Sequence, residues 1–165
     1  MISAASGVLS TPRLSLTPLQ SSDATEMVEV LSDTILYTFI GGEPPTLADL
    51  QDRYRHQVAG SPRDDESWLN WIIRVEEVAI GFVQATVVGD SADLAWVIGT
   101  EWQGQGYAGE ASAAMKSWLT ARGVVHFLAH IHPNHHASAA VATSIGLRPT
   151  GQLDQEGEEI WRGEV

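Results

Sequence analysis

Residues 93–111 read DLAWVIGTEWQGQGYAGEA, and this stretch decides the fold. Its first part, Leu94–Ile98, is an almost uninterrupted apolar run, which predicts a strand buried on both faces. A glycine-rich turn follows over 103–109, and a long helix is expected after it, to about Arg122. A buried strand that leads through a tight turn into a helix is typical of α/β proteins.

The glycine turn carries the clearest chemical signal. The first turn of a helix leaves backbone N–H groups without partners, and with the helix dipole these groups form an anion site. Small residues at Gly104, Gly106 and Ala108 allow a diphosphate to approach the backbone. A plain tight connector is the structural alternative. No Gly-Lys-Ser/Thr follows, so a Walker loop is excluded.

A dinucleotide fingerprint is a second alternative for this turn. Gly104, Gly106 and Gly109 match its letters. That fold places the motif near the start of a parallel βαβ unit, whereas three antiparallel strands are expected before it here. The position of the turn therefore argues against a dinucleotide site.

Working outward, the pattern predicts a mixed sheet with helices. Before the decisive stretch we expect a strand at 13–19, a helix from a capping box at Asp23 and Glu26 to about Asp33, a loop at 38–45, a helix begun by Thr46 and ended at Gly60, and a hairpin of strands 68–75 and 78–88. Gly81 inside the second hairpin strand indicates a bulge or a close backbone approach. After the long helix we expect a strand at 126–131, a helix at 137–145 and a final hairpin of 147–153 and 158–161.

This order describes one domain over residues 1–165, with residues 1–10 as a flexible arm. Antiparallel hairpins dominate, and a single β-α-β crossover makes one pair parallel. The fold class is therefore α/β of the α+β kind, with a mostly antiparallel central sheet flanked by helices.

Charge and composition limit the function. The 165 residues contain 9 Lys+Arg against 21 Asp+Glu, which gives a net charge of −12. Such an acidic chain does not suit nucleic acids or anionic membranes, and its field favours cationic partners such as amines. There are no cysteines, so thiolate nucleophiles and Cys-type zinc sites are excluded. With no apolar run of transmembrane length and no signal-like N-terminus, a cytoplasmic location is the expectation.

Several motifs together resemble the GNAT superfamily of acyl-CoA-dependent N-acetyltransferases. Gln103, Gly106 and Ala108 match its Gln/Arg-x-x-Gly-x-Gly/Ala pyrophosphate motif. TPRLSLTPLQSSDA, EWQGQGYAGEA and HIHPNHHASAAVATSIGLRPTG, in this order, resemble the branch that acetylates the N-termini of ribosomal proteins. The resemblance implies an acetyltransferase-like sheet that is splayed near its middle, with acetyl-CoA in the splay.

The resemblance also implies which residues contact the cofactor. Backbone amides of the glycine loop would hold the diphosphate, and the pantetheine arm would pair with the preceding strand. The implied cofactor-binding residues are Trp96, Val97, Ile98, Gln103, Gly104, Gln105, Gly106, Tyr107, Ala108 and Gly109. Trp96, Val97 and Ile98 can pack in the core and bind the cofactor at the same time.

The segment after strand 126–131 departs from the family pattern. Relatives read Pro-x-Asn-x-Ala-Ser, whereas this chain has His135 at the Asn place and Asn134 one residue earlier. The resemblance implies that Asn134 or His135 touches the cofactor or the substrate. Ser138 replaces the family's Tyr as the candidate proton donor to the leaving thiolate, and an N-cap for the next helix is its alternative role. The loop histidines are interpreted as solvated, and no metal site is expected.

A base is expected to help remove a proton from the acceptor amine, because an alkylammonium is mostly protonated at pH 7. Asp93 is the first choice, and a solvated carboxylate at a strand end is its alternative interpretation. Glu101, Glu43 and Glu77 are weaker candidates, and direct attack without a base stays open. The acceptor pocket is expected from the loop 38–45 and the loop before Glu158, with Phe39, Trp68, Trp71 and Trp161 available as walls.

The sequence therefore favours an N-acetyltransferase that moves an acetyl group from acetyl-CoA to a primary amine, either a protein N-terminus or a small molecule. The reaction would be a direct attack in a ternary complex, by a monomer or homodimer. Two alternatives remain. One is a non-catalytic CoA-binding or sensor domain of this fold, and the other is a small nucleotide-binding domain.

Overall fold

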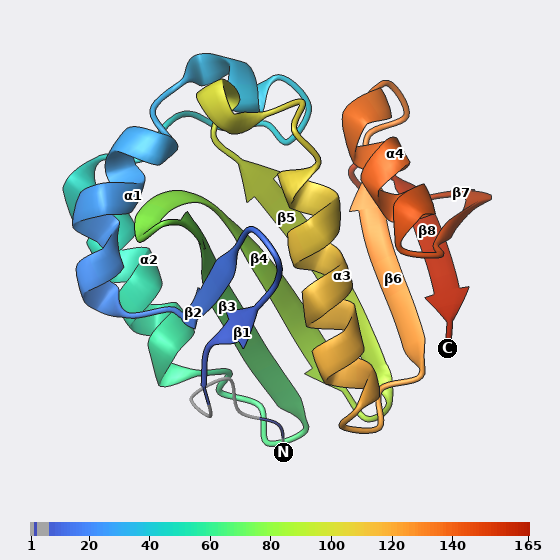
Figure 1. The fold of residues 1–165 in the computed structure, drawn as a ribbon. Coiled ribbons are helices and arrows are strands. Elements are labelled where there is room, and N and C mark those ends of the chain that lie inside the picture. The colour runs from blue at the N-terminus through green and yellow to red at the C-terminus, as the bar shows by residue number, and fades with distance from the viewer. Residues whose placement is uncertain (1, 3–6) are drawn as a thin grey trace.

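The computed structural model describes residue 2 and residues 7–165. These residues form one eight-stranded sheet with the strand order β1-β2-β3-β4-β5-β6-β8-β7, antiparallel except for the parallel pair β5 and β6 (Figure 1). The strands are β1 (Leu9–Ser10), β2 (Ser15–Pro18), β3 (Glu66–Val75), β4 (Val78–Val88), β5 (Ser91–Ile98), β6 (His126–Ile131), β7 (Arg148–Leu153) and β8 (Glu159–Glu164). The helices are α1 (Ala24–Val30), α2 (Leu47–Ala59), α3 (Tyr107–Thr120) and α4 (His136–Ser144). The predicted mixed, mostly antiparallel sheet flanked by helices is confirmed.

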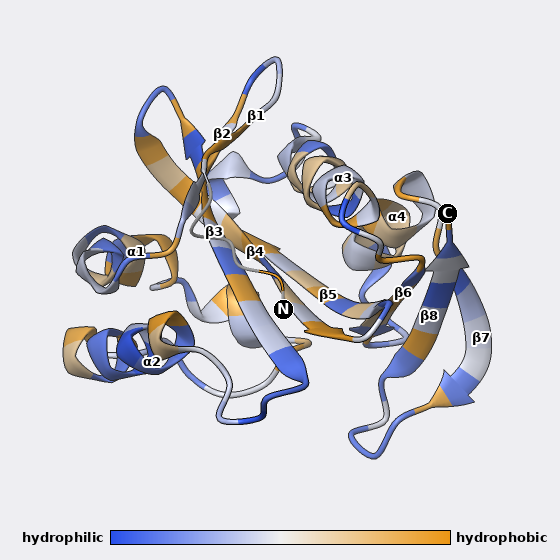
Figure 2. Ribbon diagram, turned by 90° about the horizontal axis from the view of Figure 1, so that it is seen from below, coloured by the Kyte–Doolittle hydropathy of each residue, from blue (hydrophilic) through white to orange (hydrophobic). Residues whose placement is uncertain are grey.

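Helices cover both faces of the sheet. Figure 2 shows α1 and α2 on one face and α3 and α4 on the other. A core cluster that includes Met27 and Leu50 fills the α1–α2 face, and a larger one that includes Met115 and Phe127 fills the α3–α4 face. In the part of the chain that the structure describes, each helix is too short or too polar to cross a bilayer.

The N-terminal part differs from the sequence expectation. Leu9 and Ser10 pair with Leu16 and Ser15, so the expectation of a loose arm as far as residue 10 is wrong at its C-terminal end. Residues 1 and 3–6 lie outside the described residues. The strand β1 forms because the following residues are anchored to α3, where Arg13 Nε lies 2.8 Å from Glu110 Oε1. A contact over 97 residues leaves no trace in the local pattern.

The capping box of the first helix is also displaced. Asp23 Oδ2 accepts a 2.8 Å hydrogen bond from the backbone N–H of Gln20, so a short 3-10 turn over Ser21–Asp23 precedes α1. Glu26 instead accepts from the N–H of Ala79 at 2.9 Å and pairs with Arg74 at 2.8 Å. The tertiary partners of Glu26 therefore outweigh the local cap that its spacing indicated.

The β3–β4 hairpin brings the sheet close to β5. The pairing register shifts next to Gly81, which is the predicted bulge. A Cβ atom at Gly81 would lie 2.1 Å from the carbonyl oxygen of Val97. Both predictions for Gly81, a bulge and a close backbone approach, are therefore confirmed.

The sheet opens between β5 and β6. Among the described residues, these strands pair over Ser91–Asp93 of β5, and the remaining part of β5 continues without β6 beside it. Figure 1 shows the two strands adjacent at their lower ends and separated toward the top. Because β6 diverges, Ala95, Trp96 and Val97 are only half-buried, and the expectation of a strand buried on both faces is wrong there. The splayed sheet implied by the resemblance is present.

Candidate active site

The glycine loop lies at the open end of β5. Gly104 and Gly106 have φ angles of +80° and +82°, which an L side chain rarely adopts. A Cβ at Gly104 would meet no described atom within 4 Å, and one at Gly106 would meet only Arg13 Nη2, at 3.4 Å. Since α3 begins at Tyr107, the space beside these glycines adjoins the N–H groups of its first turn. The loop therefore fits a diphosphate held by backbone groups.

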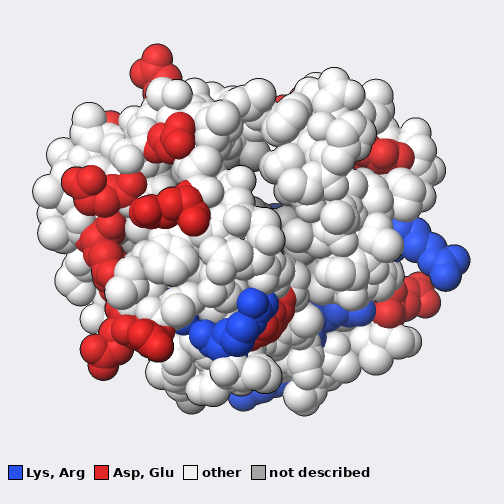
Figure 3. Space-filling model, turned by 45° about the horizontal axis from the view of Figure 1, so that its top comes forward, with Lys and Arg blue, Asp and Glu red and all other residues white. Residues whose placement is uncertain are grey.

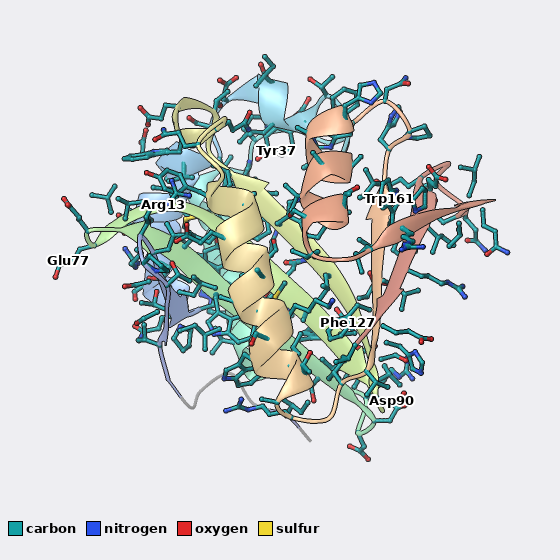
Figure 4. The ribbon with its side chains drawn as sticks, turned by 45° about the vertical axis from the view of Figure 1, so that its right-hand side comes forward. Arg13, Tyr37, Glu77, Asp90, Phe127 and Trp161 are labelled. Carbon is teal, nitrogen blue, oxygen red and sulfur yellow. The ribbon has the colours of Figure 1, made fainter. Side chains whose placement is uncertain are left out.

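Arg13 stands beside this loop, although sequence analysis missed it. Its Nη1 donates to the carbonyl oxygen of Gln105 at 2.9 Å, and its guanidinium lies 4.6 Å from the ring centre of Tyr107. Figure 4 shows Arg13 next to the N-terminal end of α3. The ion pair with Glu110 holds Arg13 in this position. Partial burial of Glu110 opposes its ionisation, but the hydrogen bonds from Thr11 and Arg13 and the charge of Arg13 outweigh burial and lower the pKa of Glu110. Arg13 therefore places a guanidinium beside the loop, with its charge balanced by Glu110.

Gln103 connects the loop to the strand. Its side-chain amide donates to the carbonyl oxygen of Ile98 at 2.9 Å. The bond fixes the end of β5 relative to the glycine loop. Gln103 thus has a clear positioning role.

The open edge of β5 faces the gap in the sheet. Trp96 and Ile98 turn their side chains into the core under α3, and Val97 turns toward α1 and α2. In the part of the chain that the structure describes, their backbone has no strand on the β6 side. Figure 3 shows a hollow in the middle of the upper face of the molecule, with Asp and Glu residues gathered to its left. The edge suits an extended chain that pairs with it, as the pantetheine arm is expected to do.

Asp93 lies where β5 and β6 part. It shares the α1–α2 face with Val97, because alternate residues of a strand point to the same side. The side chain of Asp93 is 47% exposed. Its Oδ2 lies at hydrogen-bond distance, 3.1 Å, from Nε2 of His130. Burial raises the pKa of Asp93, although the charge of His130 opposes that rise. Asp93 is therefore at the inner end of the open edge and not at an isolated strand end.

His130 and Asp154 complete a cluster that the sequence analysis missed. His130 Nδ1 lies 2.8 Å from Asp154 Oδ2. Burial would lower the pKa of His130, but the charges and hydrogen bonds of Asp93 and Asp154 outweigh it and raise that pKa. No local motif marks this cluster, because its members come from β5, β6 and the β7–β8 turn.

The loop between β6 and α4 contacts the loop after α1. The ring of His135 stacks on Phe39 with 4.7 Å between centroids, and His132 lies 5.2 Å from the same ring. Burial and the nearby His132 lower the pKa of His135. The interpretation of these two histidines as simply solvated is therefore wrong, whereas Asn134 and His136 are exposed. Among the described residues, no cluster of three or more His, Asp or Glu side chains could hold a metal ion.

Ser138 does not cap α4. The helix begins at His136 after His135, which places Ser138 inside its first turn. Its hydroxyl lies 3.4 Å from His135 Nε2 and is part-buried. The N-cap alternative is therefore wrong, and Ser138 is a half-buried hydroxyl in the first turn of α4, next to His135.

The weaker base candidates lie away from Asp93. Glu77 is in the β3–β4 turn at the far end of the sheet, at the left margin of Figure 4. Glu43 is exposed in its loop, and Glu101 lines an acidic groove with Glu29 and Asp33. Of the carboxylates suggested by the sequence, Asp93 is the one at the point where β5 and β6 part.

Two of the aromatic walls expected for the acceptor belong to the core. Trp71 is fully buried and packs edge-on against Trp118 of α3, with 5.3 Å between ring centroids. Trp161 is 8% exposed and packs into the cluster under α3 and α4. Both side chains pack into the core cluster on the face opposite Asp93, although Trp71 also borders the cavity on the Asp93 face. Trp68 is half-buried and donates to Glu66 at 2.8 Å.

A cavity of about 230 Å³ lies on the α1–α2 face. It is lined by Leu19, Leu31, Arg53, Tyr54, Gln57, Asn70, Trp71, Ile72, Phe82 and Gln84. Gln84 is on the strand next to β5, two residues from Thr86, which pairs with Asp93. The cavity therefore opens on the same face as the Asp93–His130–Asp154 cluster.

Comparisons with known proteins agree with this geometry. The family model described as acetyltransferase (GNAT) domain matches residues 13–148. No curated protein sequence matches the chain.

Solved structures share the fold at low sequence identity. A GNAT-family acetyltransferase from Bacillus anthracis has a TM-score of 0.79 and 18% identity, over 96% of this chain and 98% of that one. RimL, a ribosomal L7/L12 α-N-protein acetyltransferase, has a TM-score of 0.84 and 13% identity, over 96% and 94%. The aminoglycoside acetyltransferase AAC(6')-Ib, in complex with coenzyme A, has a TM-score of 0.77 and 18% identity, over 92% and 94%.

Proposed function

Because the chain belongs to the GNAT acetyltransferase family, whose model covers residues 13–148, we propose that it acetylates a primary amine by direct attack in a ternary complex. Membership makes it an acetyl-CoA-dependent acetyltransferase. The observation that supports the finer proposal is the gap between β5 and β6, which we call the fork. It begins at Asp93, where the two strands part, and extends along β5 to the glycine loop.

The proposed cofactor site uses backbone groups along this fork. The loop 103–109 holds the diphosphate, and the edge of Trp96, Val97 and Ile98 pairs with the pantetheine arm. From Ile98 to Asp93 the strand spans about 17 Å, so an arm that enters at the loop runs toward the fork. His135 or Asn134 and Ser138 border the gap from the α4 side.

The proposed chemistry needs a neutral amine at the inner end of the gap. Bound acetyl-CoA supplies the thioester, so that a C–N bond forms, the C–S bond breaks and the thiolate takes up a proton. The base centred on Asp93 takes the proton that makes the amine an ammonium, and the position of Asp93 on the α1–α2 face sets the side from which the acceptor enters. Ser138 is the proposed donor of the proton to the thiolate. A backbone N–H on the open edge of β5 stabilises the negative oxygen.

The proposed acceptor binds over the α1–α2 face. The loop 38–45 is held to the β6–α4 loop through Phe39, and the cavity beside Gln84 accepts the group next to the amine. Among the described residues, Arg53 forms no ion pair within 4 Å although the chain is strongly acidic, and it lines the cavity with the amides of Gln57 and Asn70. Such a lining suits carbonyl or carboxylate oxygens, which favours a peptide N-terminus over a purely cationic amine.

A panel of acceptors tests the proposal. Purified protein with acetyl-CoA is offered a peptide with a free N-terminus, the same peptide acetylated at its N-terminus, spermidine and kanamycin, and free thiol is followed. The expected result is thiol release that depends on the free α-amine and is confirmed by mass spectrometry. Saturable CoA binding without transfer to any of the amines would contradict it.

A further inference from the structure

Three side chains from separate segments meet where β5 and β6 part. Asp93 is the last residue of β5 that pairs with β6, opposite Leu128, and His130 is two residues further along β6 on the same face. His130 Nε2 lies 3.1 Å from Asp93 Oδ2, and His130 Nδ1 lies 2.8 Å from Asp154 Oδ2. The imidazole therefore bridges two carboxylates at the inner end of the gap.

Asp154 is built to hold the imidazole in one orientation. Its Oδ1 accepts hydrogen bonds from the backbone N–H groups of Glu156 and Glu158, both at 2.9 Å, and its side chain is 14% exposed. Although partial burial opposes ionisation, these N–H groups and His130 lower the pKa of Asp154. An ionised Asp154 accepts the Nδ1–H of His130, so the lone pair of a neutral His130 is on Nε2.

The charges around His130 fix how the cluster titrates. Asp93 faces it from β5, Asp154 and Glu158 face it from the β7–β8 turn, and His132 lies just after the end of β6. Nε2 and Oδ2 at 3.1 Å require one proton between them, because two lone pairs at that distance repel. Groups that interact this strongly titrate as a pair. The Asp93–His130 pair therefore holds one proton. When this proton is lost, the pair becomes a base beside the gap.

We propose that Asp154, His130 and Asp93 form a proton relay, in which Asp154 orients His130 and the His130–Asp93 pair takes the proton of the acceptor ammonium. The shared proton first leaves to solvent, and the ammonium binds between Oδ2 and Nε2 in its place. Nε2 then accepts one ammonium proton and restores the shared proton, which leaves a neutral amine. The nitrogen loses its second proton as the amide forms, and this loss balances the proton that the thiolate gains.

This relay rests on the proposed function, but its proton positions can be measured without acetyl transfer. The protein is labelled with ¹⁵N-histidine, and the ring nitrogens are followed by NMR from pH 5 to pH 9, with His130→Gln used to assign the signal. His130 is expected to titrate above the ordinary histidine range, with its proton on Nδ1 when neutral. Asp93→Asn and Asp154→Asn are each expected to lower the pKa of His130. An ordinary pKa in all three proteins, or a neutral form protonated at Nε2, overturns the relay.

The matched control is another histidine between two carboxylates. His126 Nδ1 lies 3.4 Å from Glu164 Oε1 and its Nε2 lies 4.0 Å from Asp90 Oδ2, at the exposed end of the same strand. Glu164→Gln removes a carboxylate of the same kind away from the gap. It is expected to leave the titration of His130 unchanged, and a change as large as that of Asp154→Asn overturns the specific role of Asp154.

Kinetics complete the test with the peptide as acceptor. His130→Gln is expected to lower kcat by about 10²-fold or more, and Asp154→Asn to lower it and to move the rising limb of the pH profile to lower pH. An unchanged melting shift with acetyl-CoA shows that each variant is folded. If His130→Gln keeps the rate and pH profile, the relay is overturned while the acetyltransferase proposal stands. If the unmutated protein transfers to no amine, the proposed function fails and the catalytic role of the relay fails with it.

Discussion

Replacing Gly106 by valine tests the assignment of the cofactor loop. Gly106 has a φ of +82°, and a Cβ there would enter otherwise open space beside Arg13 Nη2. The Gly106→Val side chain would fill the space in which a diphosphate is expected to contact the backbone. We therefore expect the variant to fold and to lose its response to acetyl-CoA.

The magnitudes follow from the backbone and from binding linkage. A β-branched residue in the left-handed region costs about 1–3 kcal/mol of stability. For a domain of this size, 1 kcal/mol corresponds to about 2–4 °C in Tm, so the variant should melt about 2–12 °C lower. Acetyl-CoA at 100 times its Kd adds about 2.7 kcal/mol, or about 5–11 °C, to the unmutated protein. That increment should vanish in Gly106→Val.

Thermal melting with and without acetyl-CoA measures both effects. The matched control is Gly123→Val, because Gly123 has a φ of +94° and a Cβ there meets no described atom within 4 Å. It follows the other end of α3, so it should share the loss of Tm and keep the full shift with acetyl-CoA. A Gly106→Val variant that responds to acetyl-CoA as the control does would refute the assignment of the loop.

Three further predictions concern the fork and its surroundings. Asp93→Asn should lower turnover about 10²-fold or more with little change in acetyl-CoA affinity. The control Asp90→Asn, in the exposed turn before β5, should leave turnover unchanged. A near-normal rate in Asp93→Asn removes Asp93 from the mechanism. Gly81→Ala should lower Tm by about 2–12 °C, because its Cβ would lie 2.1 Å from the carbonyl oxygen of Val97; a Tm within 1 °C of the unmutated protein would show that β4 and β5 separate at no cost. Because the folded-state pKa of His130 is raised, its contribution to stability is complete below about pH 6.5 and is lost as pH rises through the folded-state pKa. The decrease in Tm from pH 6 to pH 8.5 should therefore be smaller in His130→Gln than in the unmutated protein. Equal decreases in Tm would contradict the raised pKa of His130.

Local patterns were enough to predict most of the elements. The hairpin strand 78–88 and the strand 126–131 have the predicted limits, because turn residues and apolar periodicity act over a few neighbours. The cap of α2 at Thr46 was likewise predictable, since its hydroxyl accepts from the N–H of Asp49 three residues later. Gly81 showed its bulge because a glycine inside a strand has few other reasons to be there.

The sequence by itself also predicted the kind of cofactor site. A site made of backbone N–H groups at the start of a helix depends on the local backbone conformation. The glycines at 104 and 106 indicate that conformation, because both adopt positive φ angles. The same logic failed for side chains whose partners are distant. Glu26 has the spacing of a helix cap and instead binds Arg74 and Ala79, about 50 residues away.

Only the tertiary structure decided what surrounds Asp93. His130 and Asp154 are 37 and 61 residues from it along the chain, and they reach it because β6 lies between β5 and β8 in the sheet. Strand order is fixed by the packing of the whole core and not by any local pattern, so the imidazole between two carboxylates could not be foreseen. The sequence therefore predicted the loop that is proposed to receive the cofactor, whereas the sheet topology decided which side chains lie beside Asp93, because the electrostatic partners of a group are those closest to it in space.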